Sequence, residues 1–104
     1  MGANPGREAG AGRMKTVVRT QTYLADLEAI EAYIAQDNPG AAVEMWFLID
    51  DQVEKLADSK FPRRRGRIAG TKELVAHENY VVILIEDAAT VTALNVVHAR
   101  RKFP

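Results

Sequence analysis

The residues with the clearest capacity for chemistry stand at the end of the chain, in the run His98-Ala-Arg-Arg-Lys-Phe-Pro. An imidazole can exchange a proton near neutral pH, and an arginine can hold a phosphate through paired hydrogen bonds. His98 and Arg101 are therefore candidates for proton transfer and charge stabilisation, and Arg100 is a candidate phosphate ligand. The same residues also suit a charged terminus that only ends the fold, and their spacing does not separate the two interpretations.

A second candidate site is the densest charge in the chain, between Lys60 and Arg67. Five of these eight residues are basic, and no acidic residue follows until Glu73. The arginines, called the arginine run below, are Arg63, Arg64, Arg65 and Arg67. Neighbouring like charges repel, so a compact domain gains little from them unless an anionic partner binds. We interpret the arginine run as a target- or phosphate-binding surface; the alternative is a solvated linker.

Other polar and aromatic residues have structural interpretations. His77 falls in an expected turn and should be exposed to solvent, and Glu73 should form a salt bridge rather than act as a general base. Tyr33 and Trp46 lie at helical spacing and are expected in the core or between helices, while Tyr80 is expected to be structural. With no cysteine and two histidines, the chain predicts no metal site and no cofactor. It also lacks a Gly-rich phosphate loop and a nucleophile elbow.

Composition places the chain among small single domains. Its 104 residues have a formal net charge of zero, but residues 20–59 hold nine acidic groups and one basic group, and residues 60–104 hold nine basic and four acidic. We therefore expect an acidic helical side and a basic sheet side. No apolar run approaches the roughly 18 residues of a membrane span, which favours a cytoplasmic protein without membrane contact. We expect residues 1–13 to form a disordered tail and residues 14–104 to form the domain. Met14 could be the residue at which translation starts.

The last third of the chain predicts the sheet that must position both candidate sites. The expected strands are Lys15 to Arg19, Gly66 to Val75, Tyr80 to Ile85 and Thr90 to Val97. The run from Tyr80 is apolar without alternation, which suits a strand covered on both faces or flanked on both edges. Glycine at position 70 would allow a bulge or a close approach.

Apolar residues recur at helical spacing through the acidic middle of the chain. One apolar row is Tyr23, Leu27, Ile30 and Ile34, and the next is Ala42, Trp46, Ile49, Val53 and Leu56. Thr20 or Thr22 would cap the first helix, and Asn38 would cap a second helix that continues to about Ala57. The short break predicts a helical hairpin. The fold expected is α+β, in the order β-α-α-β-β-β, with this hairpin packed on a small, mainly antiparallel sheet.

Five segments in this order resemble the RelE/ParE superfamily of bacterial type II toxin-antitoxin toxins. They are Asp26 to Pro39 with Ala41-Ala42, Gly66-Arg67, Gly70 to Val75, Asn79-Tyr-Val-Val82 and His98 to Pro104. The similarity runs from about Lys15 to Pro104 and implies the same β-α-α-β-β-β fold. It also implies growth inhibition, a role in plasmid stabilisation, and a cognate antitoxin whose flexible segment wraps the toxin. Operator DNA would be contacted only through that antitoxin.

The resemblance implies one of two activities. ParE-like members bind DNA gyrase and are not enzymes, whereas RelE-like members cleave mRNA on the ribosome without a metal. The nucleases typically carry an arginine just after the first residue of the central strand and often a tyrosine near the C-terminus; this chain has Val81 and Phe103 there. Valine cannot stabilise a phosphorane, so we favour gyrase as the target. In the nuclease alternative, Arg65 or Arg67 holds phosphate, and His98 and Arg101 are catalytic. A third interpretation is a degenerate toxin that acts only in repression.

Overall fold

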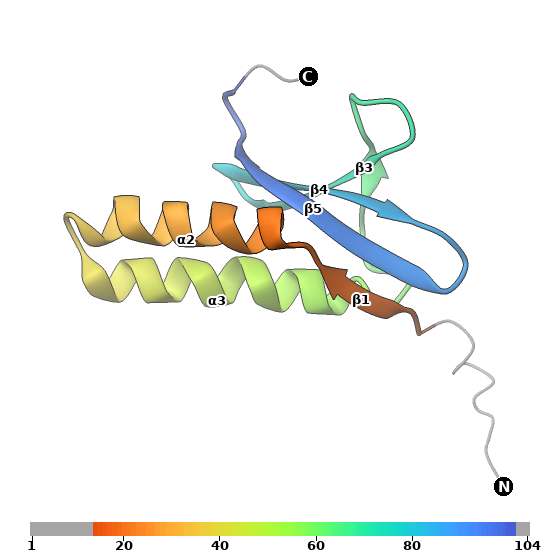
Figure 1. Ribbon diagram of the computed structural model, residues 1–104, viewed down its shortest axis with the longest axis horizontal. Helices are drawn as coiled ribbons and strands as arrows, with labels where there is room; N and C mark the ends of the chain where they lie inside the picture. The colour runs from red at the N-terminus through yellow and green to blue at the C-terminus, as the bar shows by residue number, and fades with distance from the viewer. Residues whose placement is uncertain (1–13, 102–104) are drawn as a thin grey trace, which may run out of the picture.

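A computed structural model describes residues 14–101, which form two helices packed on one five-stranded sheet (Figure 1). In chain order the elements are β1 (Thr16–Arg19), α2 (Gln21–Ala35), α3 (Pro39–Lys55), β2 (Arg64–Arg65), β3 (Lys72–His77), β4 (Tyr80–Glu86) and β5 (Thr90–His98). The expected α+β fold with a helical hairpin is confirmed. The expected tail, residues 1–13, lies outside the described residues, as do Lys102 and Phe103.

The strands lie in the order β1-β5-β4-β3-β2. β1 runs parallel to β5, and the other neighbouring pairs are antiparallel, which confirms a mainly antiparallel sheet. β4 lies between β5 and β3, and its first five residues, from Tyr80, are all buried. The apolar run without alternation is thus a strand flanked on both edges, and the side chains on both of its faces are buried from Tyr80 to Leu84.

The hairpin covers one face of the sheet and forms the core with it (Figure 1). The largest buried side chains of this core include Tyr23, Leu27, Ile49, Leu56 and Leu84. Trp46 is partly buried against the core, as expected. The expectation for Tyr33 is wrong, because this side chain is 71% exposed. Tyr33 does not belong to the row of Tyr23 and Leu27 that faces the core, so it lies on the outer side of α2.

Both helices begin at the capping residues that the sequence offers. The hydroxyl of Thr20 accepts a hydrogen bond of 3.0 Å from the backbone N–H of Tyr23. The side-chain oxygen of Asn38 accepts one of 3.0 Å from the backbone N–H of Ala41. These oxygens satisfy backbone donors that have no partner in the first helical turn. Thr20, rather than Thr22, is the N-cap of α2.

The expected strand from Gly66 to Val75 is wrong in its first half. Residues 66–71 form a turn, in which the backbone N–H of Gly66 donates to the carbonyl of Thr71 over 2.9 Å and Gly70 has φ of 83°. A Cβ atom at position 66 would overlap Thr71, so only glycine permits this approach. Strand pairing therefore occurs before and after the turn, with Arg65 opposite Lys72.

Candidate functional site

Arg63 turns inward and joins the end of α3 to the sheet. Its Nη2 atom donates hydrogen bonds of 2.9 Å to the carbonyl oxygens of Leu56 and Asp58. Carbonyls at a helix C-terminus lack partners within the helix, so a guanidinium satisfies them well. The side chain of Arg63 is only 5% exposed. This arginine has a structural position, and its charge lies beneath the surface of the arginine run.

Arg64 and Arg67 converge on the buried carboxylate of Glu73. The Nη2 atom of Arg64 lies 2.9 Å from Oε1, and the backbone N–H of Arg67 donates to Oε2 over 3.0 Å. Burial by itself would raise the pKa of Glu73, but these hydrogen bonds and charges outweigh it and lower the pKa below its ordinary value. Glu73 is a structural anion, which confirms the expected salt bridge.

Glu86 gathers three further cations at the end of β4. The Nζ atom of Lys15 lies 2.8 Å from its Oε1, and the Nζ atom of Lys72 lies 2.9 Å from its Oε2. The Nη1 atom of Arg63 lies 3.7 Å from Oε1. Although burial opposes ionisation of Glu86, the hydrogen bonds from both lysines and the charge of Arg63 lower its pKa. One carboxylate thus faces three cations, and this end of the sheet carries excess positive charge.

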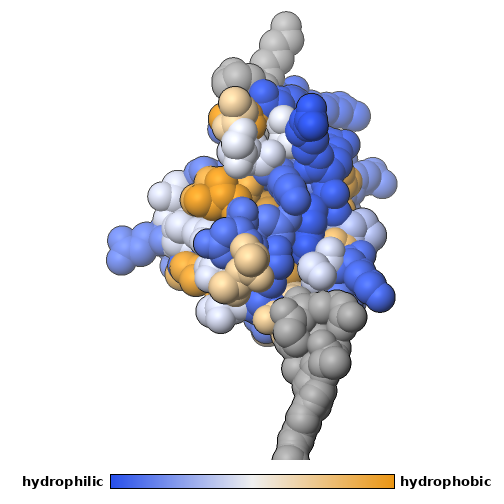
Figure 2. Space-filling model, turned by 90° about the vertical axis from the view of Figure 1, so that its right-hand side faces the viewer, coloured by the Kyte–Doolittle hydropathy of each residue, from blue (hydrophilic) through white to orange (hydrophobic). Residues whose placement is uncertain are grey.

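A pocket of about 590 Å³ opens in this basic region, between the arginine run and the 66–71 turn. Its charged lining consists of Arg63, Arg64, Arg65, Lys72 and Glu86. We call it the arginine pocket. Arg65 is exposed, and its side chain forms no hydrogen bond or ion pair with any residue in the described part of the chain. Figure 2 views the molecule from the side of the β4–β5 turn, where hydrophilic side chains cover much of the surface.

The C-terminal candidates lie at the other end of the sheet, where β4 begins and β5 ends. Tyr80 pairs with His98 across these strands, and their rings meet edge to face with centroids 5.5 Å apart. On the opposite side of Tyr80, the half-buried ring of His77 lies 6.0 Å away, so His77 is less exposed than expected. A groove of about 550 Å³ runs from Tyr80 and His98 to Tyr33 on α2. Burial, with a smaller effect of Tyr33, raises the pKa of Tyr80.

The hydrogen bonds of His98 limit its use in proton transfer. Its Nδ1 atom accepts a hydrogen bond of 3.1 Å from the backbone N–H of Arg100. In the neutral ring this contact favours the tautomer that carries the proton on Nε2. Nδ1 would have to give up this hydrogen bond in order to act as a general base. Arg100 and Arg101 are exposed, and their side chains have no partner among residues 14–101.

The two candidate sites are far apart. Arg65 pairs with Lys72, which pairs with Leu84, whereas His98 pairs with Tyr80. Strands lie about 4.8 Å apart and rise about 3.3 Å per residue, so the backbones of Arg65 and His98 are separated by about 20 Å. Figure 1 shows the two regions at opposite ends of the sheet. A phosphate bound close to the strand that carries Arg65 is therefore not within hydrogen-bonding distance of His98.

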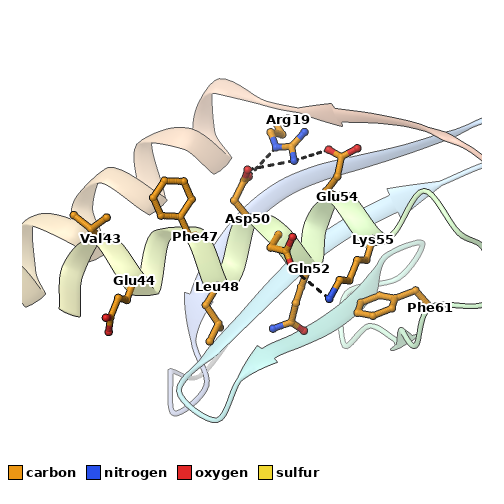
Figure 3. Close-up of a pocket in the computed structure, with 11 residues that line it drawn as sticks. Arg19, Val43, Glu44, Phe47, Leu48, Asp50, Gln52, Glu54, Lys55 and Phe61 are labelled. Atoms are coloured by element: carbon orange, nitrogen blue, oxygen red, sulfur yellow. Dashed lines mark hydrogen bonds and ion pairs between the residues drawn. The ribbon is translucent and has the colours of Figure 1, made fainter. Parts of the chain in front are cut away.

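A third surface, which the sequence did not indicate to us, runs along the outer side of α3 as a groove of about 1020 Å³ (Figure 3). Three of its apolar side chains, Val43, Phe47 and Leu48, are 46%, 67% and 42% exposed, and the partly buried Phe61 also lines it. The sequence signal was present, because Val43 and Phe47 are four residues apart and lie outside the apolar row that α3 buries. We call this surface the α3 groove.

Acidic side chains accompany the apolar ones in the α3 groove: Glu44, Asp50, Asp51 and Glu54. Asp50 is fixed in place, since its Oδ1 accepts hydrogen bonds of 2.8 Å from Arg19 and 2.9 Å from the hydroxyl of Tyr23. Burial and the interaction with Asp50 raise the pKa of Tyr23. The groove therefore offers an apolar strip beside negative charge (Figure 3).

Two further properties bear on the class of site. Within residues 14–101, no three carboxylate or imidazole side chains gather in a way that could hold a metal ion. Neither helix in this part of the chain has the length and apolar character needed to cross a membrane.

Comparison with known proteins gives a consistent assignment. Residues 17–103 match the family described as "ParE toxin of type II toxin-antitoxin system, parDE". A curated protein named "Putative toxin Y4kP", from Sinorhizobium fredii (strain NBRC 101917 / NGR234), is 34% identical over 90 residues, which cover 86% of this chain and 94% of the relative. A chain of the solved "Chromosomal ParDE TA system from P. aeruginosa" has the same fold, with a TM-score of 0.72 and 20% identity over 83% of this chain and 97% of that one. The chain therefore belongs to the ParE toxin family of type II toxin-antitoxin systems, within the RelE/ParE superfamily.

Proposed function

We propose that this protein inhibits growth by binding DNA gyrase in the cytoplasm, and that it does so without cleaving RNA. The observation that carries this proposal is the separation of about 20 Å between the backbones of Arg65 and His98, which removes the arginine run from the imidazole and leaves Arg100 and Arg101 as the cations next to it in the sequence. A metal-independent nuclease needs phosphate-holding cations and a proton-transfer group at the same phosphate. The position of Val81 supports the proposal, because this residue stands where the resembling nucleases carry arginine and is only 2% exposed.

In this proposal the exposed arginines are contact residues rather than catalysts. Arg65 and Arg100 are exposed and have no intramolecular partner among the described residues, so they are available to a target. Arg64 and Arg67 present part of their surface as well, with side chains 53% and 43% exposed. Charged side chains at the rim of an interface mainly raise the association rate and the specificity.

We further propose that a cognate antitoxin neutralises the protein by covering the α3 groove. Exposed neighbouring apolar side chains such as Val43 and Phe47 mark a surface that a partner covers. The groove lining has four carboxylates and two cations, Arg19 and Lys55, and Asp51 is paired with Lys55 over 3.2 Å. The remaining excess of negative charge, which includes Glu44, favours an amphipathic segment with basic residues. The structurally similar P. aeruginosa protein comes from a ParDE toxin-antitoxin system, which agrees with such a partner. Operator DNA would be reached only through this antitoxin.

The test uses the purified full-length chain. It should inhibit supercoiling by gyrase and increase the amount of cleaved gyrase-DNA complex, while leaving mRNA intact on translating ribosomes. In cells without antitoxin, DNA synthesis should fall before protein synthesis.

A double variant, His98→Ala with Arg101→Ala, is the control and should retain gyrase inhibition. Unchanged gyrase activity with mRNA cleavage that the double variant loses would instead establish the nuclease alternative. Harmless expression would favour a role confined to repression.

A further inference from the structure

The end of the sheet that holds the arginine pocket has far more positive than negative charge. Glu73 and Glu86 lie there almost fully buried, and the exposed carboxylate of Asp87 interacts with Lys15. The cations close to them or in the pocket lining are Lys15, Arg63, Arg64, Arg65, Arg67 and Lys72. Holding these six cations together costs free energy that the three carboxylates offset only in part. An additional anion at this place would lower that cost.

Arg63 lines the pocket from beneath, with a side chain that is only 5% exposed. Its Nε atom is buried and has no hydrogen-bond partner among residues 14–101, so this part of the guanidinium is not neutralised by a direct contact. The side chain is held by Leu56, Asp58 and Glu86, which fixes the charge in advance of any binding.

Three cationic side chains of the pocket can reach a bound group. Arg65 is exposed and has no partner among the described residues, while Arg64 and Lys72 have side chains 53% and 49% exposed. We propose that the arginine pocket binds a carboxylate of an acidic segment on the protein's target. Arg65 would form the main contact, assisted by Arg64 and Lys72, with Arg63 supplying fixed charge from beneath. This proposal rests on the proposed function, in which the protein acts by binding another protein.

A carboxylate fits the chemistry of the pocket. The same group of cations already holds two carboxylates, with N···O distances of 2.8 to 2.9 Å for Lys15, Arg64 and Lys72. The planar fork of Arg65 can bind both oxygens of a third carboxylate at once, which a lysine cannot do. A nucleic-acid phosphate would also be attracted by the charge, and it is the competing outcome of the test.

The test measures binding of two probes to the full-length chain by fluorescence anisotropy. One probe is a short glutamate-rich peptide, and the other is a single-stranded oligonucleotide of equal net charge. We expect the wild type to bind the peptide more tightly, and Arg65→Glu to weaken peptide binding about tenfold or more. Lys60→Glu is the matched control: it reverses an exposed charge in the same segment, does not line the pocket, and should leave peptide binding within about twofold.

Other results overturn the proposal. Tighter binding of the oligonucleotide than of the peptide would show that the pocket is a nucleic-acid site. If neither probe binds, or if Arg65→Glu and Lys60→Glu weaken peptide binding equally, the arginine pocket is not a binding site for carboxylates. The gyrase assay separates this proposal from the proposed function. If the wild type inhibits gyrase and Arg65→Glu inhibits it equally, the pocket proposal fails alone. If the wild type binds the peptide through Arg65 but leaves gyrase unaffected, the choice of gyrase fails alone.

Discussion

The guanidinium of Arg64 lies 2.9 Å from the Oε1 atom of Glu73, a carboxylate that is only 1% exposed. Arg65, the next residue, has no partner within the described part of the chain. Two adjacent arginines in the same basic run therefore have different roles. One satisfies a buried charge and supports the fold, and the other is available at the surface for binding.

Replacing Arg64 by alanine should lower the free energy of unfolding by about 1.5–3 kcal/mol, the usual contribution of a hydrogen bond to a charged group. The reason is that buried Glu73 would keep its bond from the backbone N–H of Arg67 but lose its closest cation. Arg65→Ala is the control and should stay within about 0.5 kcal/mol of the wild type. Urea unfolding of the three proteins measures the difference; equal stability of the two variants would contradict it.

Stability should fall in acid. The pKa values of Glu73 and Glu86 are lowered from the ordinary value of 4.5, so the unfolded chain takes up protons at a higher pH than the folded chain does. The stabilisation is complete above the unfolded pKa and is lost as the pH falls through the folded pKa. Unfolding midpoints measured at steps below about pH 5 should therefore decrease steadily. Glu86→Gln should show a weaker decrease, whereas Glu44→Gln, which changes an exposed residue, should follow the wild type.

Stability should also fall in strong alkali. Burial and Asp50 raise the pKa of Tyr23 above its ordinary value of 10.0, so the unfolded chain loses this proton first. The contribution is complete below about pH 10 and decreases as the pH rises further. Tyr23→Phe should remove this part of the pH dependence and, at neutral pH, cost about 1 kcal/mol for the lost hydrogen bond to Asp50. An identical alkaline profile in wild type and variant would show that Tyr23 is not responsible.

Local signals were sufficient for most of the fold. Thr20 and Asn38 cap the helices through contacts three residues away, and the apolar run from Tyr80 specifies a strand inside the sheet. The error from Gly66 to Val75 has a physical cause. The residue types in this range are compatible with a strand. In the structure, however, Gly66 approaches Thr71 closely and Gly70 has a positive φ, and both features belong to a turn. The turn depends on the pairing of β2 with β3, which cannot be recognised from the sequence alone.

The candidate sites were harder to predict, because their partners are distant in the sequence. The pattern Arg-Arg-Arg-Gly-Arg looks like uniform positive charge, yet Arg63 binds the end of α3 and lies near Glu86, 23 positions later. Nothing local distinguishes it from Arg65. The same holds for the separation of Arg65 from His98, which follows only from the strand order and register.

The α3 groove gives the most direct test of antitoxin binding. Phe47 is 67% exposed, so Phe47→Asp removes apolar contact area and adds a charge beside existing carboxylates without disturbing the core. We expect the variant to remain folded and to inhibit gyrase, while its affinity for the antitoxin falls at least tenfold. Tyr33→Asp is the matched control, because it places the same charge at another exposed aromatic residue, 71% exposed and outside the groove. Calorimetric titration with the antitoxin measures both. Equal loss of affinity in the two variants would indicate a general charge effect, and unchanged affinity in Phe47→Asp would exclude the α3 groove as the antitoxin site.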